Sequence, residues 1–546
     1  MKFTKKRIVT VIGSAVCALA LMAGFTACGE KKSRIKTNEK GEILEITTPN
    51  NPENGEYDPA GAAAYVYFTY QQYCLEGLIQ YDKDGKILPA TAKSWEISDD
   101  LCTYTFHLRE DSKWSDGSDV TSYDFKNTMI RALNPDKGSW YVDFLFVIKG
   151  ASEAFYGDGS LDDFAVQTPD AHTLEITLKE PCAYFLDLCK LPVYMPSNCK
   201  YATEEDETWD MTPGKNLCNG PYYFAERKAG EYVVYKKNPY YYDADKVNLL
   251  SIKDMYMDDD QAKASAYQTS ELNLIIGAPS SLAEKYEGKP DLQFAEIPQT
   301  NYILFNINMK PFDDVRVRKA FAEAVKRVDI ATVVGISCVP SSTFVGRFYK
   351  SKADGTEWGK MQGELLKEDL EEAKKLLAEA GYPNGEGLPP ITYTYPAQAY
   401  EADVAQVLQQ QWQQLGVTVN LESMEYEVYV DERRSGKLQL ARHQWYADYN
   451  DPTTWLLMYS DGNAQNDVKW YNKEYNDLLS ASSKEIDAAK RESELMAAEK
   501  ILVSDECVIC PLFTNNNTNL IDPSLDNYYF DVLVYQVFYG MKVKSE

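Results

Sequence analysis

The sequence of 546 residues contains few side chains of the types that catalyse reactions, and their spacing is poorly suited to catalysis. Only three histidines occur, His107, His172 and His443, and the last lies beside the motif described below. The spacings HExxH, GxxxxGK[ST], GxSxG and GxGxxG before a helix are all missing from the sequence. The sequence therefore argues against an enzyme, although two carboxylates brought together by folding would not be visible in it.

The cysteines and acidic runs give no strong metal or redox signal. Cys507 and Cys510 form a CxxC pattern, but residues 506–512 are mostly apolar and predict a buried strand, in which positions three apart face opposite sides. No second CxxC and no nearby histidine completes a zinc site. Nine cysteines lie beyond the first 28 residues, an odd number that excludes complete pairing, so buried free thiols are expected. The run Asp258–Asp260 lacks the glycine and terminal glutamate of a calcium loop, which favours a solvated turn.

The composition is that of a folded, acidic protein. Apolar residues make up 44% of the chain and aromatic residues 13%, including 40 tyrosines. The net charge is -27, and because affinity for nucleic acid depends on clustered Lys and Arg, nucleic acid is not an expected partner. The length allows about three to five domains, or one large multi-lobed unit.

The N-terminal residues predict export. Residues 1–27 carry basic side chains followed by an apolar stretch, as a secretory signal peptide does. Cys28 follows small residues, and we expect its thiol to be lipidated, although Phe25 stands where such signals usually have leucine. Residues 28–40 are polar and predict a flexible tether. The expected location is the outer face of the cytoplasmic membrane, with an uncleaved N-terminal anchor as the alternative.

Short strands and amphipathic helices alternate along the remaining chain. Thr103–Leu108 and Thr173–Leu178 alternate apolar and polar residues, which predicts strands with one buried face, and a further strand is expected at Asn301–Asn308. Apolar residues recur at helical spacing over three later segments, 317–325, 370–380 and 404–415. Asp369 is a predicted N-cap, Gly381 and Gly416 end the second and third helices, and a strand at 417–421 follows. This alternation predicts an α/β fold.

Three stretches resemble the extracytoplasmic solute-binding proteins of the oligopeptide, dipeptide and nickel class that feed ABC importers (bacterial solute-binding protein family 5). The first is LPATAKSWEISDDLCTYTFHLREDSKWSDGSDVTSYDF at 88–125. The others are Asn219–Tyr222 with Tyr235–Tyr241, and Phe312–Ala320. Together with the intervals between them, these stretches cover nearly the whole chain after the signal peptide. The resemblance implies a two-lobed periplasmic-binding-protein-like fold with an extra subdomain and a hinge between the lobes.

The resemblance also implies domain boundaries. The core of lobe I would comprise residues 41–79, 203–300 and 517–546, and the extra subdomain of that lobe residues 80–202. Lobe II would comprise residues 301–516. We expect crossover strands to join the two lobes.

The segment Trp445–Pro452, WYADYNDP, carries the sharpest similarity. It is similar to the segment in oligopeptide-binding members whose aspartate pairs with the α-ammonium of the peptide, and by that match Asp448 is the amine anchor. A fixed carboxylate suits this role, since hydrogen bonds to charged groups contribute about 1.5–3 kcal/mol. By position, Arg442 and Arg433 match arginines of the family, the former facing a peptide carboxylate, and Tyr141 matches a tyrosine that lies along the bound backbone. The alternative for Asp448 is a carboxylate that caps the turn after it.

Other positions complete the predicted contacts or depart from the family. Trp445 and Tyr446 are expected to contact the ligand, and Tyr446 stands where some members have a cysteine of a disulfide. Tyr67 stands near the position of a glutamate by the peptide amine, and we expect it to contact the ligand. Glu401 stands near that of a histidine on the carboxylate side. We therefore expect peptide length and carboxylate recognition to differ from the best-known members.

The resemblance implies a lipid-anchored monomer that captures oligopeptides between its lobes and passes them to a membrane permease. Main-chain hydrogen bonds to strand edges would bind the peptide, while separate subunits hydrolyse ATP. No cofactor, no metal and no covalent chemistry are expected. Three alternatives remain: a binder of oligosaccharide or another small solute in the same class, a peptide-pheromone receptor, and an extracellular peptidase or glycosidase.

Overall fold

The computed structural model describes residues 35–50, 57–62, 65–203, 205–206, 208–347, 349–398 and 400–544. The predicted signal peptide and Cys28 lie outside the described residues, so both stay predictions. Among the described helices, none has the length and apolar composition that crossing a bilayer requires.

The first lobe is built on a four-stranded sheet in the order β1-β10-β9-β8. β1 is parallel to β10, and the other pairs are antiparallel. Helix α2 (Tyr65–Cys74) packs against β8. The strands are β1 (Ile46–Asn50), β8 (Tyr222–Lys228), β9 (Tyr232–Lys237) and β10 (Ser251–Tyr256). Three two-stranded ribbons accompany them: β2 (Ile79–Tyr81) with β3 (Ile87–Pro89), β19 (Leu525–Asp526) with β22 (Lys542–Val543), and β20 (Tyr529–Phe530) with β21 (Gln536–Val537).

A second four-stranded sheet, antiparallel throughout, is formed within the segment predicted as the extra subdomain. Its order is β4-β5-β7-β6, with β4 (Ala92–Ile97), β5 (Thr103–Leu108), β6 (Val166–Asp170) and β7 (Thr173–Thr177). The predicted strand Thr103–Leu108 is confirmed, and its alternate residues are buried as expected. Helix α3 (Ser122–Ala132) begins after a capping box in which Asp124 accepts the Thr121 backbone N–H at 2.8 Å. Two shorter helices follow, α4 (Ala151–Tyr156) and α5 (Phe185–Leu188).

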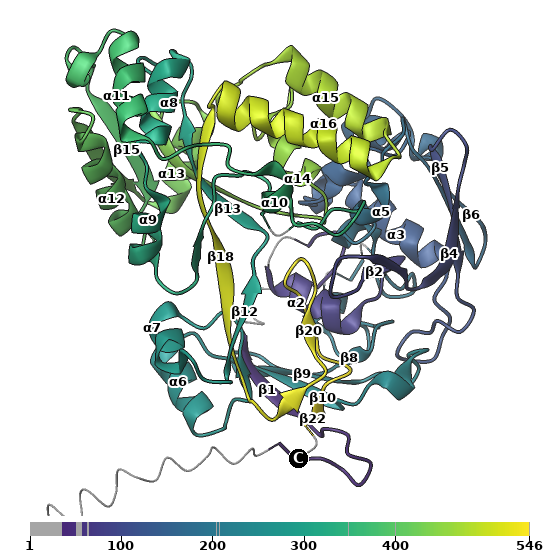
Figure 1. The fold of residues 1–546 in the computed structure, drawn as a ribbon. Helices are drawn as coiled ribbons and strands as arrows, with labels where there is room; N and C mark the ends of the chain where they lie inside the picture. Colours follow the sequence, from purple (N-terminus) through teal and green to yellow (C-terminus); the bar gives the residue numbers. More distant parts are fainter. Residues whose placement is uncertain are drawn as a thin grey trace, which may run out of the picture.

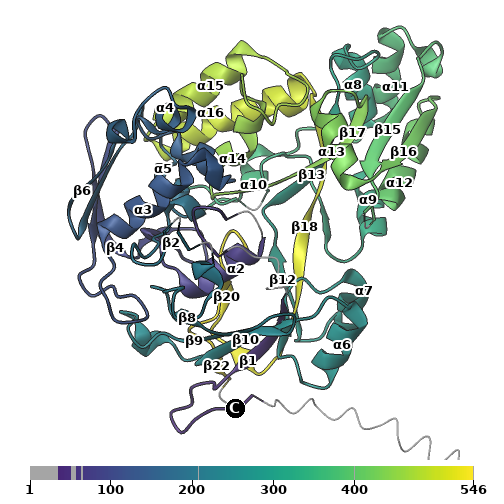
Figure 2. The same cartoon turned by 180° about the vertical axis from the view of Figure 1, so that it is seen from behind.

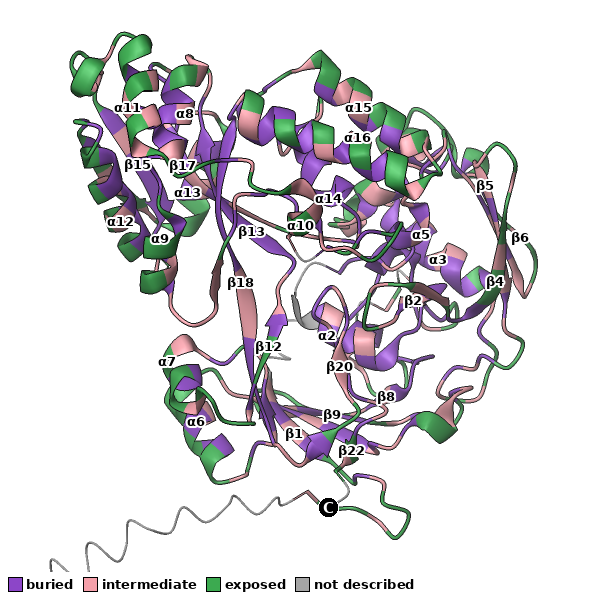
Figure 3. Cartoon of the chain, viewed as in Figure 1, coloured by how far each residue is buried: buried purple, intermediate pink, exposed green. Residues whose placement is uncertain are grey.

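An eight-stranded mixed sheet dominates the remainder of the chain. Its main order is β11-β18-β13-β17-β15-β16, and β12 and β14 pair with β18 as well. The strands are β11 (Leu274–Ile275), β12 (Leu292–Glu296), β13 (Gln299–Phe305), β14 (Cys338–Pro340), β15 (Ile391–Pro396), β16 (Val419–Met424), β17 (Leu440–Tyr446) and β18 (Ile509–Ile521). Every residue of β13 is buried, as expected for a strand covered on both faces (Figure 3).

Helices cover this sheet and fill the space beside it. α12 packs on β15 and β16, α11 packs on α8, and these helices lie together at the β15–β16 end of the sheet (Figures 1 and 2). The side-chain cap predicted at Asp369 is confirmed, since its carboxylate accepts the backbone N–H groups of Glu371 and Glu372. The helices are α6 (Asp260–Gln268), α7 (Ser280–Ala283), α8 (Val315–Glu323), α9 (Arg327–Val334), α10 (Trp358–Gln362), α11 (Leu370–Glu379), α12 (Glu401–Gln413), α13 (Tyr426–Arg434), α14 (Thr453–Leu456), α15 (Lys473–Lys484) and α16 (Ala488–Lys500).

Two large hydrophobic cores correspond to two lobes. The first takes most of its residues from 43–252 together with 521–541, and the second takes its residues from 302–513. β18 runs from one core to the other (Figure 1), because Ile509 and Phe513 near its start lie in the second core and Ile521 at its end lies in the first. The expected two-lobed α/β architecture is thus present, and the finer domain boundaries stay predictions.

The CxxC segment differs from its prediction in detail. Residues Ile501–Asp505 extend α16 by a wider turn, and Cys507 adopts a left-handed φ of 45°, so β18 begins at Ile509 and not at residue 506. Both thiols of the pattern are buried, and burial raises the pKa of Cys510 to about 11. All nine cysteines in the described residues are free, and in the same residues no group of three or more His, Cys, Asp or Glu side chains is arranged to hold a metal ion.

Candidate ligand-binding site

A cavity of about 900 Å³ lies between the two cores. One wall comes from residues 140–188, whose aromatic side chains pack on the first core, and the other comes from residues 396–465, which pack on the second. Small-molecule sites of about 300–1,000 Å³ occur preferentially at such boundaries. All of the predicted ligand contacts except Tyr67 line it: Tyr141, Arg433, Arg442, Trp445, Tyr446 and Asp448.

Strand β17 supplies part of the second wall and leaves one of its edges open. It pairs with β13 along its whole length, but with β15 only at Leu440 and Ala441. Among the described strands, none pairs with the edge of residues 442–446 opposite β13. The backbone carbonyl of Arg442 accepts a hydrogen bond from the Tyr429 hydroxyl. The Gln444 backbone N–H donates to His443 Nδ1 at 2.7 Å. The remaining backbone groups of this edge can offer donors and acceptors to an extended chain.

Asp448 follows β17 at the start of a tight turn. Its backbone N–H donates to Thr454 Oγ1 at 3.1 Å, while its half-buried side chain lines the cavity. Within the described part of the chain, the Asp448 carboxylate has no hydrogen-bond or ion-pair partner, and burial alone raises its pKa to about 7. A buried carboxylate without a partner is stabilised by any cationic hydrogen-bond donor that enters the cavity.

The turn after Asp448 is capped by Asp451. Its Oδ1 accepts the backbone N–H of Thr453 at 3.1 Å and the Thr453 hydroxyl at 2.7 Å. The predicted alternative, in which Asp448 caps this turn, therefore gains no support from the side-chain hydrogen bonds. Asp448 is left facing the cavity.

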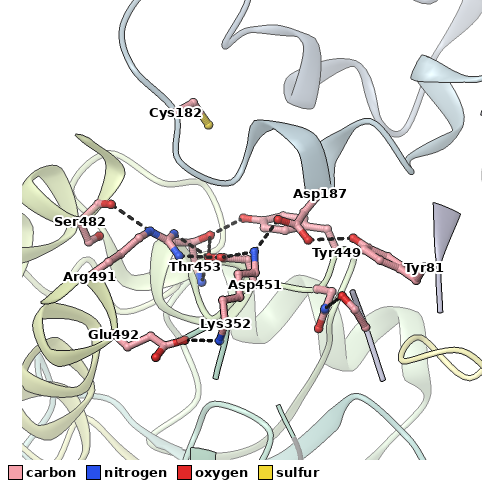
Figure 4. A network of polar contacts seen from close by, with 12 residues as sticks. Tyr81, Cys182, Asp187, Lys352, Tyr449, Asp451, Thr453, Ser482, Arg491 and Glu492 are labelled. Atoms are coloured by element: carbon pink, nitrogen blue, oxygen red, sulfur yellow. Dashed lines mark hydrogen bonds and ion pairs between the residues drawn. The ribbon is translucent and has the colours of Figure 1, made fainter. Parts of the chain in front are cut away.

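Asp451 is also the centre of a buried network of charges that joins the two walls (Figure 4). Arg491 donates to both of its carboxylate oxygens, at 2.7 and 2.8 Å, and Lys352 Nζ lies 3.3 Å from Oδ2. Lys352 also donates to Asp187 of α5 at 2.6 Å, and Asp187 accepts from the Tyr81 hydroxyl at 3.0 Å. Although burial opposes it, the two cations hold the pKa of Asp451 well below its ordinary value. The network thus fixes the turn that presents Asp448.

Arg442 is already paired within the protein. Its Nη2 lies 2.5 Å from Glu401 Oε1, with the two side chains 11% and 6% exposed. The same nitrogen donates to Asn301 Oδ1 at 3.0 Å and to Gln444 Oε1 at 2.6 Å. The glutamate that stands near the family's histidine position therefore neutralises the arginine that was predicted to face a ligand carboxylate.

Arg433 is paired by charge, without a hydrogen bond from its Nε to any described residue. Its Nε lies 3.0 Å from Asp467 Oδ2, and both side chains are buried. His443 lies 3.7 Å from the same oxygen and stacks on Tyr302 with a ring separation of 4.8 Å. Burial, followed by the nearby arginines, lowers the pKa of His443 well below its ordinary value, so this ring is neutral at physiological pH.

Aromatic rings make up much of the remaining surface of the cavity. Tyr141 packs edge-on against Phe68 at 5.8 Å, and its pKa is raised, first by burial and then by the charge of Asp448. Tyr446 is 50% exposed and Trp140 is 74% exposed, although both line the cavity. Rings with open faces can stack on flat ligand groups and attract cations.

Tyr67 is placed elsewhere. It does not line the cavity; its side chain is fully buried in the first core, among rings that include Phe68 and Tyr70. Its predicted ligand contact is not supported by this position. Position in the chain matched the family, but side-chain direction is decided by packing.

Two charged residues that line the cavity were not predicted from the sequence. Arg434 at the end of α13 and Asp143 both line the cavity and are exposed. Their only sequence signal is adjacency, since each lies within two residues of a predicted contact, Arg433 or Tyr141.

Comparisons with known proteins agree with this geometry. The family model described as bacterial extracellular solute-binding proteins, family 5 Middle, matches residues 86–467. The dipeptide-binding protein DppE of Bacillus subtilis is 32% identical over 511 residues, covering 92% of this chain and 93% of that protein. The oligopeptide-binding protein OppA of the same organism is 32% identical over 530 residues, covering 95% and 96%. The crystal structure of a periplasmic oligopeptide-binding protein of Borrelia burgdorferi, OppAIV, superposes with a TM-score of 0.73 at 29% identity, covering 92% of this chain and all of that one.

Proposed function

The chain belongs to the bacterial extracellular solute-binding proteins of family 5, which are substrate-binding components of transporters and not enzymes, and from this premise we propose that it captures oligopeptides. The peptide would occupy the cavity between the lobes, with its α-ammonium on Asp448. The relatives named as dipeptide- and oligopeptide-binding proteins support this ligand class.

The observation that carries the proposal is the state of Asp448. It is the half-buried carboxylate in the cavity that has no internal partner within the described residues, and it follows directly after a strand with an open edge. An extended peptide brings one ammonium at its end and a regular row of backbone groups behind it. Main-chain pairing with residues 442–446 would then bind peptides of varied sequence.

Delivery and location are parts of the same proposal. The lobes would close over the peptide by a hinge and dock on a membrane permease, with ATP hydrolysed by separate subunits. The protein would act as a monomer held at the outer face of the cytoplasmic membrane through a lipid on Cys28. We keep the predicted division into a lobe I core, an extra subdomain at 80–202 and lobe II at 301–516.

The test is mass spectrometry of the small molecules released when the purified protein is denatured. Peptides of a narrow length range support the proposal. Release of an oligosaccharide would favour sugar binding on the open rings of Trp140 and Tyr446, and would refute the peptide assignment.

Asp448→Asn, purified in parallel, tests the anchor itself. It should carry less peptide than the natural protein. Asp403→Asn is the matched control, because Asp403 is an exposed carboxylate on α12 that does not line the cavity. An Asp448→Asn protein that carries as much peptide as Asp403→Asn would contradict the anchoring role.

A further inference from the structure

Some of the charged side chains that line the cavity are ion-paired within the protein, and others are not. Its cationic side chains are Arg433, Arg434 and Arg442, and its carboxylates are Asp143 and Asp448. Within the described residues, neither carboxylate makes an ion pair, whereas two of the three arginines do. The fixed charge left for a ligand is therefore negative on balance.

The pair between Arg442 and Glu401 blocks the position where a ligand carboxylate was expected. The two side chains lie 2.5 Å apart and are nearly buried, so their attraction is weakly screened. A second carboxylate brought to Arg442 would meet the negative charge of Glu401. It would also compete with Asn301 and Gln444, which already accept from the same guanidinium nitrogen.

Arg433 and Arg434 are also poor partners for a ligand carboxylate. Arg433 is held at 3.0 Å by Asp467, again with both partners buried. Arg434 makes no ion pair with any described residue, but it is exposed, and ion pairs at exposed positions contribute only about 0–1 kcal/mol. Among the described residues that line the cavity, each buried cation is balanced by a buried carboxylate.

From these pairings we infer that the cavity recognises the amine end of its peptide and leaves the carboxyl end unrecognised. Glu401 and Asp467 act as built-in substitutes for the ligand's carboxylate. The ligand class is then peptides with a free ammonium whose C-terminus is amidated, extended or free, bound about equally well. This inference rests on the proposed peptide-binding function.

The test compares alanine peptides of three to six residues, each as the free acid and as the C-terminal amide, by isothermal titration calorimetry. Each added residue moves the C-terminal carboxylate of the peptide further along β17 from Asp448. Arg442 and Asp448 are six residues apart, which is at most about 20 Å, so this range of lengths includes peptides that can reach Arg442. For the natural protein we expect acid and amide to bind within threefold of each other at every length. A preference for the acid of more than threefold at any length would overturn the inference.

Glu401→Gln tests the cause. It keeps the shape of the side chain, removes its charge and frees Arg442, so we expect a preference of at least tenfold for the acid at one length. Asp403→Asn, two residues along the same helix, is the matched control and should behave as the natural protein does. If Glu401→Gln is folded by circular dichroism and still shows no preference, Glu401 is not the blocking group and the inference is wrong. If it does not fold, the comparison of acid with amide in the natural protein still decides.

The two proposals fail in different ways. If no alanine peptide binds at any length, or if N-acetylated peptides bind as well as free ones, the proposed recognition of a peptide amine fails and this inference fails with it. If free-ammonium peptides bind but require the carboxylate, peptide binding stands and only the inference about the carboxyl end is overturned.

Discussion

Asp448→Asn should change ligand binding and protein stability in opposite directions. A hydrogen bond to a charged group contributes about 1.5–3 kcal/mol, and each 1.4 kcal/mol is a factor of ten in affinity. Loss of the carboxylate should therefore weaken the binding of tri-alanine about 10- to 150-fold at pH 7.5.

The stability effect follows from the pKa of Asp448, which burial raises to about 7 from an ordinary value of 3.8. A carboxyl group whose pKa is raised on folding binds protons more tightly in the folded state. Its contribution to stability is fully present below the unfolded-state pKa and is lost as pH rises through the folded-state pKa, here between about pH 4 and pH 7. That loss is at most about 4 kcal/mol, and the half-buried position of the side chain reduces it to roughly 2–4 kcal/mol.

Asparagine carries no charge, so the variant escapes this loss. In the absence of ligand, Asp448→Asn should be more stable than the natural protein by roughly 2–4 kcal/mol at pH 8, and nearly equal to it at pH 4. Urea unfolding followed by the fluorescence of the nine tryptophans measures both values, and calorimetric titration with tri-alanine measures binding. Asp403→Asn should change neither quantity by more than about 0.5 kcal/mol.

Two results would refute this reasoning. If Asp448→Asn binds tri-alanine within threefold of the natural protein, Asp448 is not the anchor of the ammonium. If its gain in stability is the same at pH 4 and pH 8, ionisation of the buried carboxylate is not the cause, whatever happens to binding.

Four further outcomes are expected. The affinity of the natural protein for tri-alanine should be greatest between about pH 7 and 8. Asp448 is protonated at lower pH, and the peptide ammonium, with a pKa of about 7.7–8.0, is neutralised at higher pH. Calorimetric titrations across pH 5.5–9 check this, and an affinity that does not change with pH would contradict it. Asp451→Asn leaves the buried guanidinium of Arg491 without its carboxylate partner, while Lys352 keeps Asp187, and should lower the free energy of unfolding in urea by about 3–5 kcal/mol. A change below about 1 kcal/mol would show that the network does not support the turn. Trp140→Ala should leave the urea midpoint unchanged because the ring is 74% exposed, while weakening the binding of tripeptides that contain phenylalanine more than that of tri-alanine; equal effects on both peptides would argue against ring stacking. Cys28→Ser should abolish labelling of the protein by radioactive palmitate in growing cells and release it into the medium, and persistent labelling would exclude Cys28 as the lipid site.

Much of the site could be predicted because its residues are close together in the chain. Strand β17 and the turn after it carry Arg442 and Asp448 on one short segment, so proximity in sequence enforces proximity in space. Secondary structure was predicted best where several local signals coincide, as at the helix that Asp369 caps and that ends before Gly381, which takes a positive φ.

The partners of these residues could not be predicted, because contacts between distant elements select them. Glu401 begins α12 and was noted only as standing near a histidine position of the family, and Asp467 lies in a loop beyond the motif. No spacing in the sequence marks either of them as the partner of an arginine. The link from Lys352 to both Asp187 and Asp451 likewise depends on the packing of two lobes. For Tyr67, the position in the sequence suggested a ligand contact, but the ring packs in the first core and does not line the cavity.

The shared strand β18 has a consequence for how the chain acquires its structure. β18 occupies residues 509–521 of 546, and in the eight-stranded sheet it pairs with β11, β12, β13 and β14. A ribosome makes the N-terminal segments first, and domains generally fold as units in that order. The four-stranded sheet β1-β10-β9-β8 needs only residues 46–256, whereas the eight-stranded sheet cannot be completed until β18, near the end of the chain, has been synthesised.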